Sequence, residues 1–179
     1  MRHKFLEDDI LLLRAVNAED AETMWDVEND SSQWIENSMS APISRTVLTD
    51  YALSYKADPF HDGQLRLIVE HKADKTIAGI VDLYEISAIH RRAFIGIYIL
   101  PAFRNRGLAT RALDLLENYA FSLLNLDKLG AKIVINNKES IKLFRKQNFS
   151  QCGCIPGWIR TGNEEKDLLL FSKNLKNKY

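Results

Sequence analysis

Hydrophobic residues in the first third of the chain follow two different periods. One short apolar run, 10–16, has the length and the β-branched composition of a strand. In two later segments, 17–28 and 44–55, apolar residues recur every three or four positions, which is the spacing of an amphipathic helix. Asn17 and Ser44 stand at the starts of these segments as candidate N-caps. We therefore expect a strand followed by two helices.

In the middle of the chain, after a polar turn at 61–63, the spacing of apolar residues changes to that of β-strands. Three strand-like runs follow closely, at 65–71, 77–87 and 92–100, and the tight turn between the first two predicts an antiparallel meander. The longest helical pattern, 108–126, comes next. Its expected buried face consists of Leu108, Ala112, Leu115, Tyr119 and Leu123.

The last third alternates between the two patterns. It contains an apolar strand at 128–135, a short helix at 140–147, and two strands at 149–155 and 168–171 linked by a polar turn at 161–163. No repeat or linker interrupts the sequence. The pattern predicts a single α+β domain that covers all 179 residues. Its core is a mixed, mostly antiparallel sheet of about seven strands flanked by about four helices.

Composition says more about the binding partners of the protein than about its fold. Lysine and arginine balance aspartate and glutamate at 24 each, so nothing indicates a general attraction to nucleic acid or to a membrane surface. The first residues lack an apolar run of signal-peptide length, and we expect a cytoplasmic protein. Cys152 and Cys154 are the two cysteines of the chain. They are too few for a zinc site or a disulfide framework, and we expect reduced structural thiols and no metal centre.

One stretch, 97–110, has the composition of an anion site. An apolar strand stops at Pro101, a short basic loop with Arg104 and Arg106 follows, and a helix begins after Gly107. The first turn of a helix offers free N–H groups and the positive end of the helix dipole. Two arginines beside those amides suit a pyrophosphate. The residues expected to bind it are Arg104, Asn105, Arg106, Gly107, Leu108, Ala109 and Thr110.

Two motifs in this sequence resemble signatures of the GCN5-related N-acetyltransferases (GNAT). Arg104-x-x-Gly107-x-Ala109 is similar to their acetyl-CoA motif, and 137–149 is similar to their second signature. The resemblance implies the fold of that family and acetyl-CoA as cosubstrate. It also places Asn137, Ser140 and Phe144 near the cofactor. Asn137 could bind the pantetheine amides or cap the helix. Asn148 stands where the family has glycine, and asparagine tolerates the left-handed conformation needed there.

A narrower likeness points to the bacterial spermidine/diamine N-acetyltransferases. It rests on segments 79–86, 90–93, 107–111 and 119–129, and on Trp34-Ile-Glu36. The resemblance implies acetyl transfer to a small-molecule amine, a polyamine in particular, and a homo-oligomer. It also implies substrate binding by Glu36, Asp82 and Glu85. One departure is Phe144, where the family has a tyrosine that protonates the leaving thiolate.

The residues also permit an outline of the chemistry. The backbone of Ile97 to Ile99 would pair with the pantetheine arm as an added strand, and a backbone N–H near Ile99 would polarise the thioester carbonyl. Few amine molecules are neutral at pH 7, so a base or a water chain is useful. The candidates for this role are Glu85, Asp82 and His90. Tyr98 or Tyr84 could supply the proton to sulfur, and no covalent intermediate is needed.

Two other functions are compatible with the sequence. An acetyltransferase for protein N-termini would have the same cofactor motifs without needing acidic substrate residues. A CoA-binding or polyamine-sensing protein without catalytic activity would explain Phe144.

Overall fold

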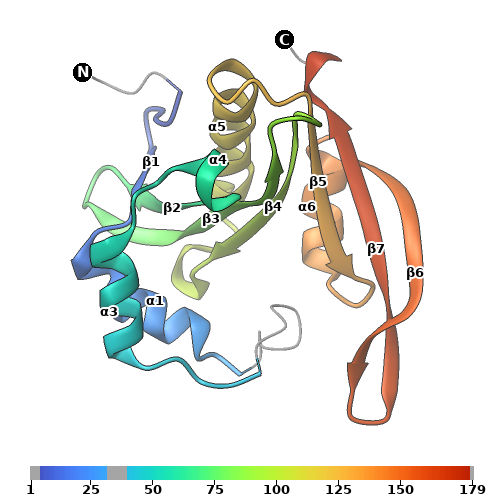
Figure 1. Ribbon diagram of the computed structural model, residues 1–179, viewed down its shortest axis with the longest axis horizontal. Helices are drawn as coiled ribbons and strands as arrows, with labels where there is room; N and C mark the ends of the chain where they lie inside the picture. The colour runs from blue at the N-terminus through green and yellow to red at the C-terminus, as the bar shows by residue number, and fades with distance from the viewer. Residues whose placement is uncertain (1–4, 32–39, 178–179) are drawn as a thin grey trace.

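The computed structural model describes residues 5–31 and 40–177. They form one seven-stranded sheet in the order β1-β2-β3-β4-β5-β7-β6 (Figure 1). All neighbouring strands are antiparallel except β4 and β5, which are parallel. The strands are β1 (Leu11–Ala15), β2 (Gln64–His71), β3 (Thr76–Ser87), β4 (Arg92–Ile99), β5 (Lys128–Val134), β6 (Ser150–Thr161) and β7 (Glu164–Asn174).

Helices cover both faces of this sheet. Within the described ranges there are five α-helices and three short 3-10 turns. The α-helices are α1 (Ala21–Glu28), α3 (Arg45–Ser54), α4 (Pro59–Asp62), α5 (Leu108–Ser122) and α6 (Lys138–Lys146). The expected α+β fold, with its mixed and mostly antiparallel sheet, is confirmed. Ser44 caps α3 as expected, because its hydroxyl accepts a hydrogen bond from the Val47 N–H.

Two hydrophobic cores lie on opposite faces of the sheet. The larger one packs α5 and α6 against the central strands, and Leu113, Leu116 and Phe171 are among its fully buried members. The smaller one packs α1 and α3 over β2 and β3, around Met24 and Ile68. Among the described residues, the helices of this face lie over β2 and β3, and their core reaches β4 at Tyr98, so no described helix lies over the rest of β4 or over β5 on this face (Figure 1). We call this part the open face.

Three expectations about element boundaries were wrong. β6 and β7 extend well beyond the apolar runs, because their distal halves form an arm in which β6 has no buried residue and therefore no apolar signal. The expected turn at 61–63 belongs to α4, which Asp58 caps and Gly63 ends. α5 ends at Ser122, and Leu123 is 58% exposed, so the buried stripe is rotated from the expected one. That stripe is Leu108, Ala112, Leu113, Leu116, Glu117 and Ala120.

The parallel pair of strands separates after a very short contact. β4 and β5 are in register only at Arg92–Lys128, Ala93–Leu129 and Phe94–Gly130. Beyond this point the two strands diverge, and the opening between them widens toward the C-terminal ends of both strands (Figure 1). This opening interrupts an otherwise continuous ladder.

An ion pair is buried between α5 and β7. The Lys173 ammonium donates to a Glu117 carboxylate oxygen at 2.6 Å, and the two side chains are 7% and 0% exposed. The ammonium also lies 5.4 Å from the centroid of the Phe149 ring. Removing one partner of such a pair destabilises the fold, because the remaining buried charge is neither paired nor solvated.

We expect Lys173→Met to lower the free energy of unfolding by about 3–5 kcal/mol, because it removes the ammonium that faces Glu117. Lys173→Met combined with Glu117→Leu should recover most of that loss, since it removes both charges. Urea unfolding of the two variants measures the difference. Equal destabilisation by the single and the double variant would contradict the expectation.

Candidate active site

The backbone of β4 directs polar groups into the opening. The Leu100 N–H donates to the Ala78 carbonyl at 2.9 Å, and Tyr98 pairs with Ile80 of β3. Alternate residues of an antiparallel ladder direct their amides and carbonyls to the same partner strand. The amides and carbonyls of Ile97 and Ile99 therefore point away from β3, into the opening.

The loop that joins β4 to α5 narrows one end of this opening. The Arg104 side chain folds back, and its Nε donates to the Ile99 carbonyl at 3.0 Å. Its guanidinium carbon also lies 5.4 Å from the centroid of the Tyr98 ring. The Arg106 guanidinium carbon lies at the same distance from the ring of Phe103. Both arginines are thus held beside the loop by aromatic rings.

Gly107 is the N-cap of α5 and adopts the left-handed conformation, with φ of 76°. Asn105 is left-handed too, with φ of 61°. A Cβ placed on Gly107 would meet no atom within 4 Å, so the space in front of the helix terminus is open. The first turn of α5, all of which the structure describes, carries no acidic side chain. The expected residues 104–110 are therefore brought together in an arrangement that suits a pyrophosphate.

The second signature forms the start and end of α6. The Asn137 side-chain oxygen accepts a hydrogen bond from the Ser140 N–H at 3.0 Å, so this residue caps the helix. Phe144 is only 3% exposed, and its ring packs edge-on against Phe149 at a centroid distance of 5.0 Å. A contact between Phe144 and a cofactor stays a prediction. Asn148 has φ of 61°, and the expected left-handed conformation is confirmed.

Arginine neutralises part of the acidic cluster expected on the open face. Arg66 of β2 contacts both carboxylate oxygens of Asp82, at 2.8 and 3.1 Å, and donates to Glu28 at 2.7 Å. Burial lowers the pKa of Arg66, but the charges and hydrogen bonds of Asp82 and Glu28 outweigh it and raise the pKa overall. Asp82 is therefore held in place and partly neutralised beside Gly96, its partner on β4.

A β-bulge positions Glu85 at the edge of the same face. The register between β3 and β4 shifts between Tyr84 and Ser87, and Glu85 has φ of 49°. Its carboxylate forms an ion pair with Lys132 of β5. A bulge re-aims a side chain, and here it brings the carboxylate across to β5. Burial, followed by the nearby Glu85 and Asp82 carboxylates, raises the pKa of Tyr84 to about 12.

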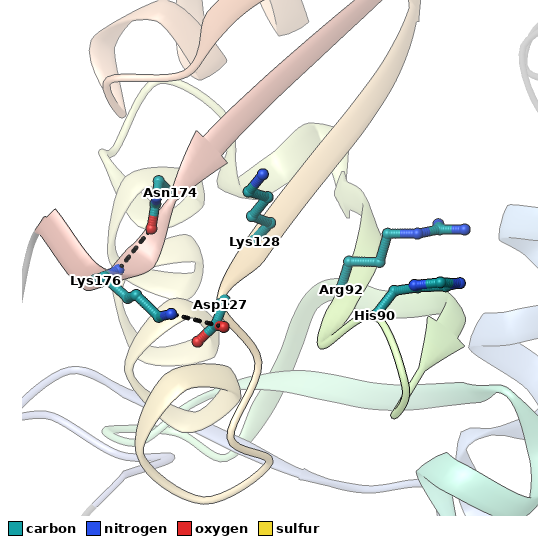
Figure 2. A pocket seen from close by; sticks show the side chains of 6 residues that line it. All are labelled: His90, Arg92, Asp127, Lys128, Asn174 and Lys176. Atoms are coloured by element: carbon teal, nitrogen blue, oxygen red, sulfur yellow. Dashed lines mark hydrogen bonds and ion pairs between the residues drawn. The ribbon is translucent and has the colours of Figure 1, made fainter.

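Two further residues expected in the site are Glu36 and His90. Glu36 falls outside the described residues. Figure 2 shows His90 beside Arg92, at the start of β4, in the lining of a cavity of about 610 Å³. In that view His90 and Arg92 point away from Asp127 and Lys176, which pair at 3.0 Å. This cavity is at the paired end of β4 and β5, whereas the α5 N-terminus is at their separated end.

The cysteines lie on the edge strand β6 and are exposed free thiols. The free state agrees with the expected reduced thiols, and their structural role stays a prediction. Slight burial, followed by the charge and hydrogen bond of Asp167, raises the pKa of Cys154. A raised pKa makes a thiol a poorer nucleophile at neutral pH.

Three residues of the open face escaped the sequence reasoning: Arg66, Phe94 and Lys132. Arg66 is a charged residue within an apolar strand, and this pattern could have indicated that its side chain belongs to a polar site. Its partner could not be identified without the register that places it opposite Asp82. Lys132 gives the same kind of signal, a charge within an apolar strand.

We expect Gly107→Asp to raise the KM for acetyl-CoA about tenfold relative to Gly107→Asn. The two side chains have the same shape and both tolerate the left-handed conformation, but only aspartate repels an anion there. Steady-state kinetics compares the two variants. A thermal melt serves as the control, because aspartate at a helix N-terminus should not lower the Tm. Equal KM values would contradict a pyrophosphate at this position.

Comparison with known proteins agrees with this geometry. Residues 11–150 match the model of the acetyltransferase (GNAT) domain family. The spermidine N(1)-acetyltransferase of Escherichia coli K12 is 35% identical over 142 residues, which is 77% of this chain and 72% of that protein.

Solved structures with the same fold include two from Vibrio cholerae. A spermidine N-acetyltransferase in complex with CoA and spermine superposes with a TM-score of 0.82 at 24% identity, covering 94% of this chain and 98% of that one. A dodecameric spermidine N-acetyltransferase in an intermediate state gives 0.79 at 25% identity, covering 96% and 97%. The strand opening, the α5 terminus and the family match lead to one conclusion. The chain belongs to the GNAT family of acetyltransferases and uses acetyl-CoA as its acyl donor.

Proposed function

We propose that this protein acetylates a primary amine of a small polyamine or diamine, by direct attack of the amine on the thioester. The observation that carries the proposal is a group of three carboxylates with two cations: Asp82, which lies opposite Gly96 of β4, shares Arg66 with Glu28, and Glu85 pairs with Lys132. Carboxylates on the acceptor side attract an alkylammonium ion. Similarity to the E. coli spermidine N(1)-acetyltransferase supports the same substrate class.

The cofactor-binding part of the proposal uses the backbone. Acetyl-CoA supplies the activated acetyl group. The amides of Ile97 and Ile99 face the opening, where one of them would donate to the thioester carbonyl oxygen and stabilise the charge that develops on it. The terminal amides of α5, with Arg104 and Arg106, would hold the pyrophosphate.

Proton transfer is the second part of the proposal. An alkylammonium ion has a pKa near 10.4, so roughly one amine molecule in a thousand is neutral at pH 7. Glu85 is 52% exposed and could pass this proton to water. Phe144 has no group that could protonate the leaving thiolate, so we assign that role to water or to Tyr98. Cys152 and Cys154 are not assigned a role, since the attack needs no covalent intermediate.

The homo-oligomer implied by the sequence remains part of the proposal. The dodecameric spermidine N-acetyltransferase of V. cholerae, which matches 96% of this chain, supports it. Light scattering coupled to size exclusion measures the assembly directly, and a monomer at micromolar concentration would contradict it.

Release of CoA thiol from acetyl-CoA, measured against a panel of amines, tests the proposed function. We expect saturable turnover with spermidine, spermine or putrescine. Glu85→Gln should lower kcat/KM for these substrates about tenfold, because it removes a negative charge from the open face and leaves the Lys132 charge without its partner. Glu164→Gln, which alters a 77% exposed carboxylate on the distal arm, is the matched control.

Other outcomes would point to different functions. Turnover only with peptides that begin with Ala or Ser would make the protein an N-terminal acetyltransferase. CoA binding without turnover of any amine would make it a CoA-binding or polyamine-sensing protein, and gain of activity in Phe144→Tyr would identify the missing hydroxyl as the cause.

The pH profile of kcat/KM tests whether Tyr84 acts as an acid or a base in the reaction. Because its pKa is raised to about 12, the phenol stays protonated from pH 7 to 10 and does not titrate in this range. We expect kcat/KM to follow the same pH profile in Tyr84→Phe as in the unaltered protein. A titration step near pH 10 that Tyr84→Phe abolishes would contradict this assignment.

A further inference from the structure

The ammonium of Lys132 lies near two aromatic rings and one carboxylate on the open face. Its Nζ is 4.5 Å from the centroid of the Phe94 ring and 5.7 Å from that of Tyr84. It also forms the ion pair with Glu85. One carboxylate and two aromatic faces are what proteins use to bind an alkylammonium ion. We call Glu85, Tyr84 and Phe94 the ammonium cage.

The fold builds this cage from the adjacent strands β3 and β4, and β5 supplies the lysine that occupies it. The rings of Tyr84 and Phe94 stack at a centroid distance of 5.7 Å with an interplanar angle of 24°. The bulge in β3 turns Glu85 toward them. Gly130 makes room for the Phe94 ring, since a Cβ on that residue would lie 2.7 Å from two ring atoms.

The cage lies where a polyamine would extend. Phe94 is the last residue of β4 that pairs with β5, and Gly96, the next residue on the same face, lies opposite Asp82. The amides proposed to act on the thioester begin at Ile97. An amine that reacts there and carries a second ammonium a few carbons away would place it at Asp82 or at the cage.

We propose that Lys132 determines acceptor specificity by occupying the ammonium cage itself. Its own ammonium takes the place that a second ammonium of the substrate would otherwise fill. The unaltered protein therefore takes its diamine and polyamine substrates with the second ammonium toward Asp82 and none in the cage. Removal of the Lys132 charge adds the cage as a position for the second ammonium. This inference rests on the proposed function for its kinetic test, and its binding test does not require turnover.

Two further cations lie on the same face, outside the cage. Arg92 and Lys128 are opposite one another on β4 and β5. Arg92 is two residues N-terminal to Phe94, on the same face of the sheet. The side chains of Arg92 and Lys128 are both exposed. Like charges opposite one another are unfavourable even without a ligand. A polyamine could not extend past the cage toward this pair of cations, so the cage is the last ammonium position at that end of the face.

Lys132→Met tests the inference, because methionine removes the charge, is one heavy atom shorter than lysine and still packs on aromatic rings. Lys128→Met is the matched control, since it removes the same charge from the same strand outside the cage. Putrescine and n-butylamine have the same carbon chain and differ by one ammonium group. The ratio of their kcat/KM values therefore isolates the contribution of the second charge.

We expect this ratio to rise about tenfold in Lys132→Met and to stay within twofold in Lys128→Met. Adding Glu85→Gln to Lys132→Met should abolish the gain. Calorimetric titration of spermidine into each protein with CoA bound should give about tenfold tighter binding in Lys132→Met. Should no variant acetylate any amine, the proposed function fails, and tighter spermidine binding in Lys132→Met would still support the cage.

Two results would overturn the inference. One is an unchanged putrescine-to-butylamine ratio together with an unchanged spermidine Kd in Lys132→Met. The other is an equal gain in Lys128→Met, which would reveal a general charge effect of the strand rather than a site built from Glu85, Tyr84 and Phe94.

Discussion

The parallel ladder between β4 and β5 ends at Phe94 and Gly130, and the arrangement of the site depends on that short contact. A longer ladder would use the amides and carbonyls of Ile97 and Ile99 to hold β5. Because the strands separate instead, these groups face an opening that an extended ligand can enter as an additional strand. The same separation directs the chain after β4 into the basic loop and the left-handed Gly107 at the start of α5.

The opening also divides the sheet into a packed face and an open one. α5 and α6 cover the first face completely enough to bury a lysine and a glutamate as a pair. On the other face, the small core of α1 and α3 reaches β4 at Tyr98 and includes none of the described residues of β5. The proposed function would use this asymmetry, since the pantetheine arm would enter between the strands while the amine would approach from the open face.

Much of this architecture could be predicted from the sequence because it depends on local patterns. The β4 run, its stop at Pro101 and the glycine before α5 are contiguous, and their chemistry follows from strand and helix termini. Asn148 was predictable for the same reason, as its left-handed conformation belongs to the helix end itself. The distal arm of β6 and β7 was not, because an arm with little burial carries no apolar period.

Contacts on the open face depend instead on register, which the sequence does not reveal. Arg66 meets Asp82 because β2 and β3 pair with those two residues opposite. Glu85 reaches Lys132 only because a bulge in β3 inserts an extra residue. Reading Asp82 and Glu85 as acidic positions was possible from the sequence, but the cations that accompany them could be found only in three dimensions.

The two ion pairs of the open face differ in a way that bears on substrate choice. Arg66 is held by two carboxylates, and its side chain and that of Glu28 are only 23% and 12% exposed, so separating them would leave charges with little solvent. The Lys132–Glu85 pair is more exposed, at 33% and 52%, and pairs of that kind contribute little stability. The first is therefore a fixed part of the sheet. The second can be exchanged for a ligand's ammonium at small cost, which makes position 132 the place where a single substitution changes the acceptor without disturbing the fold.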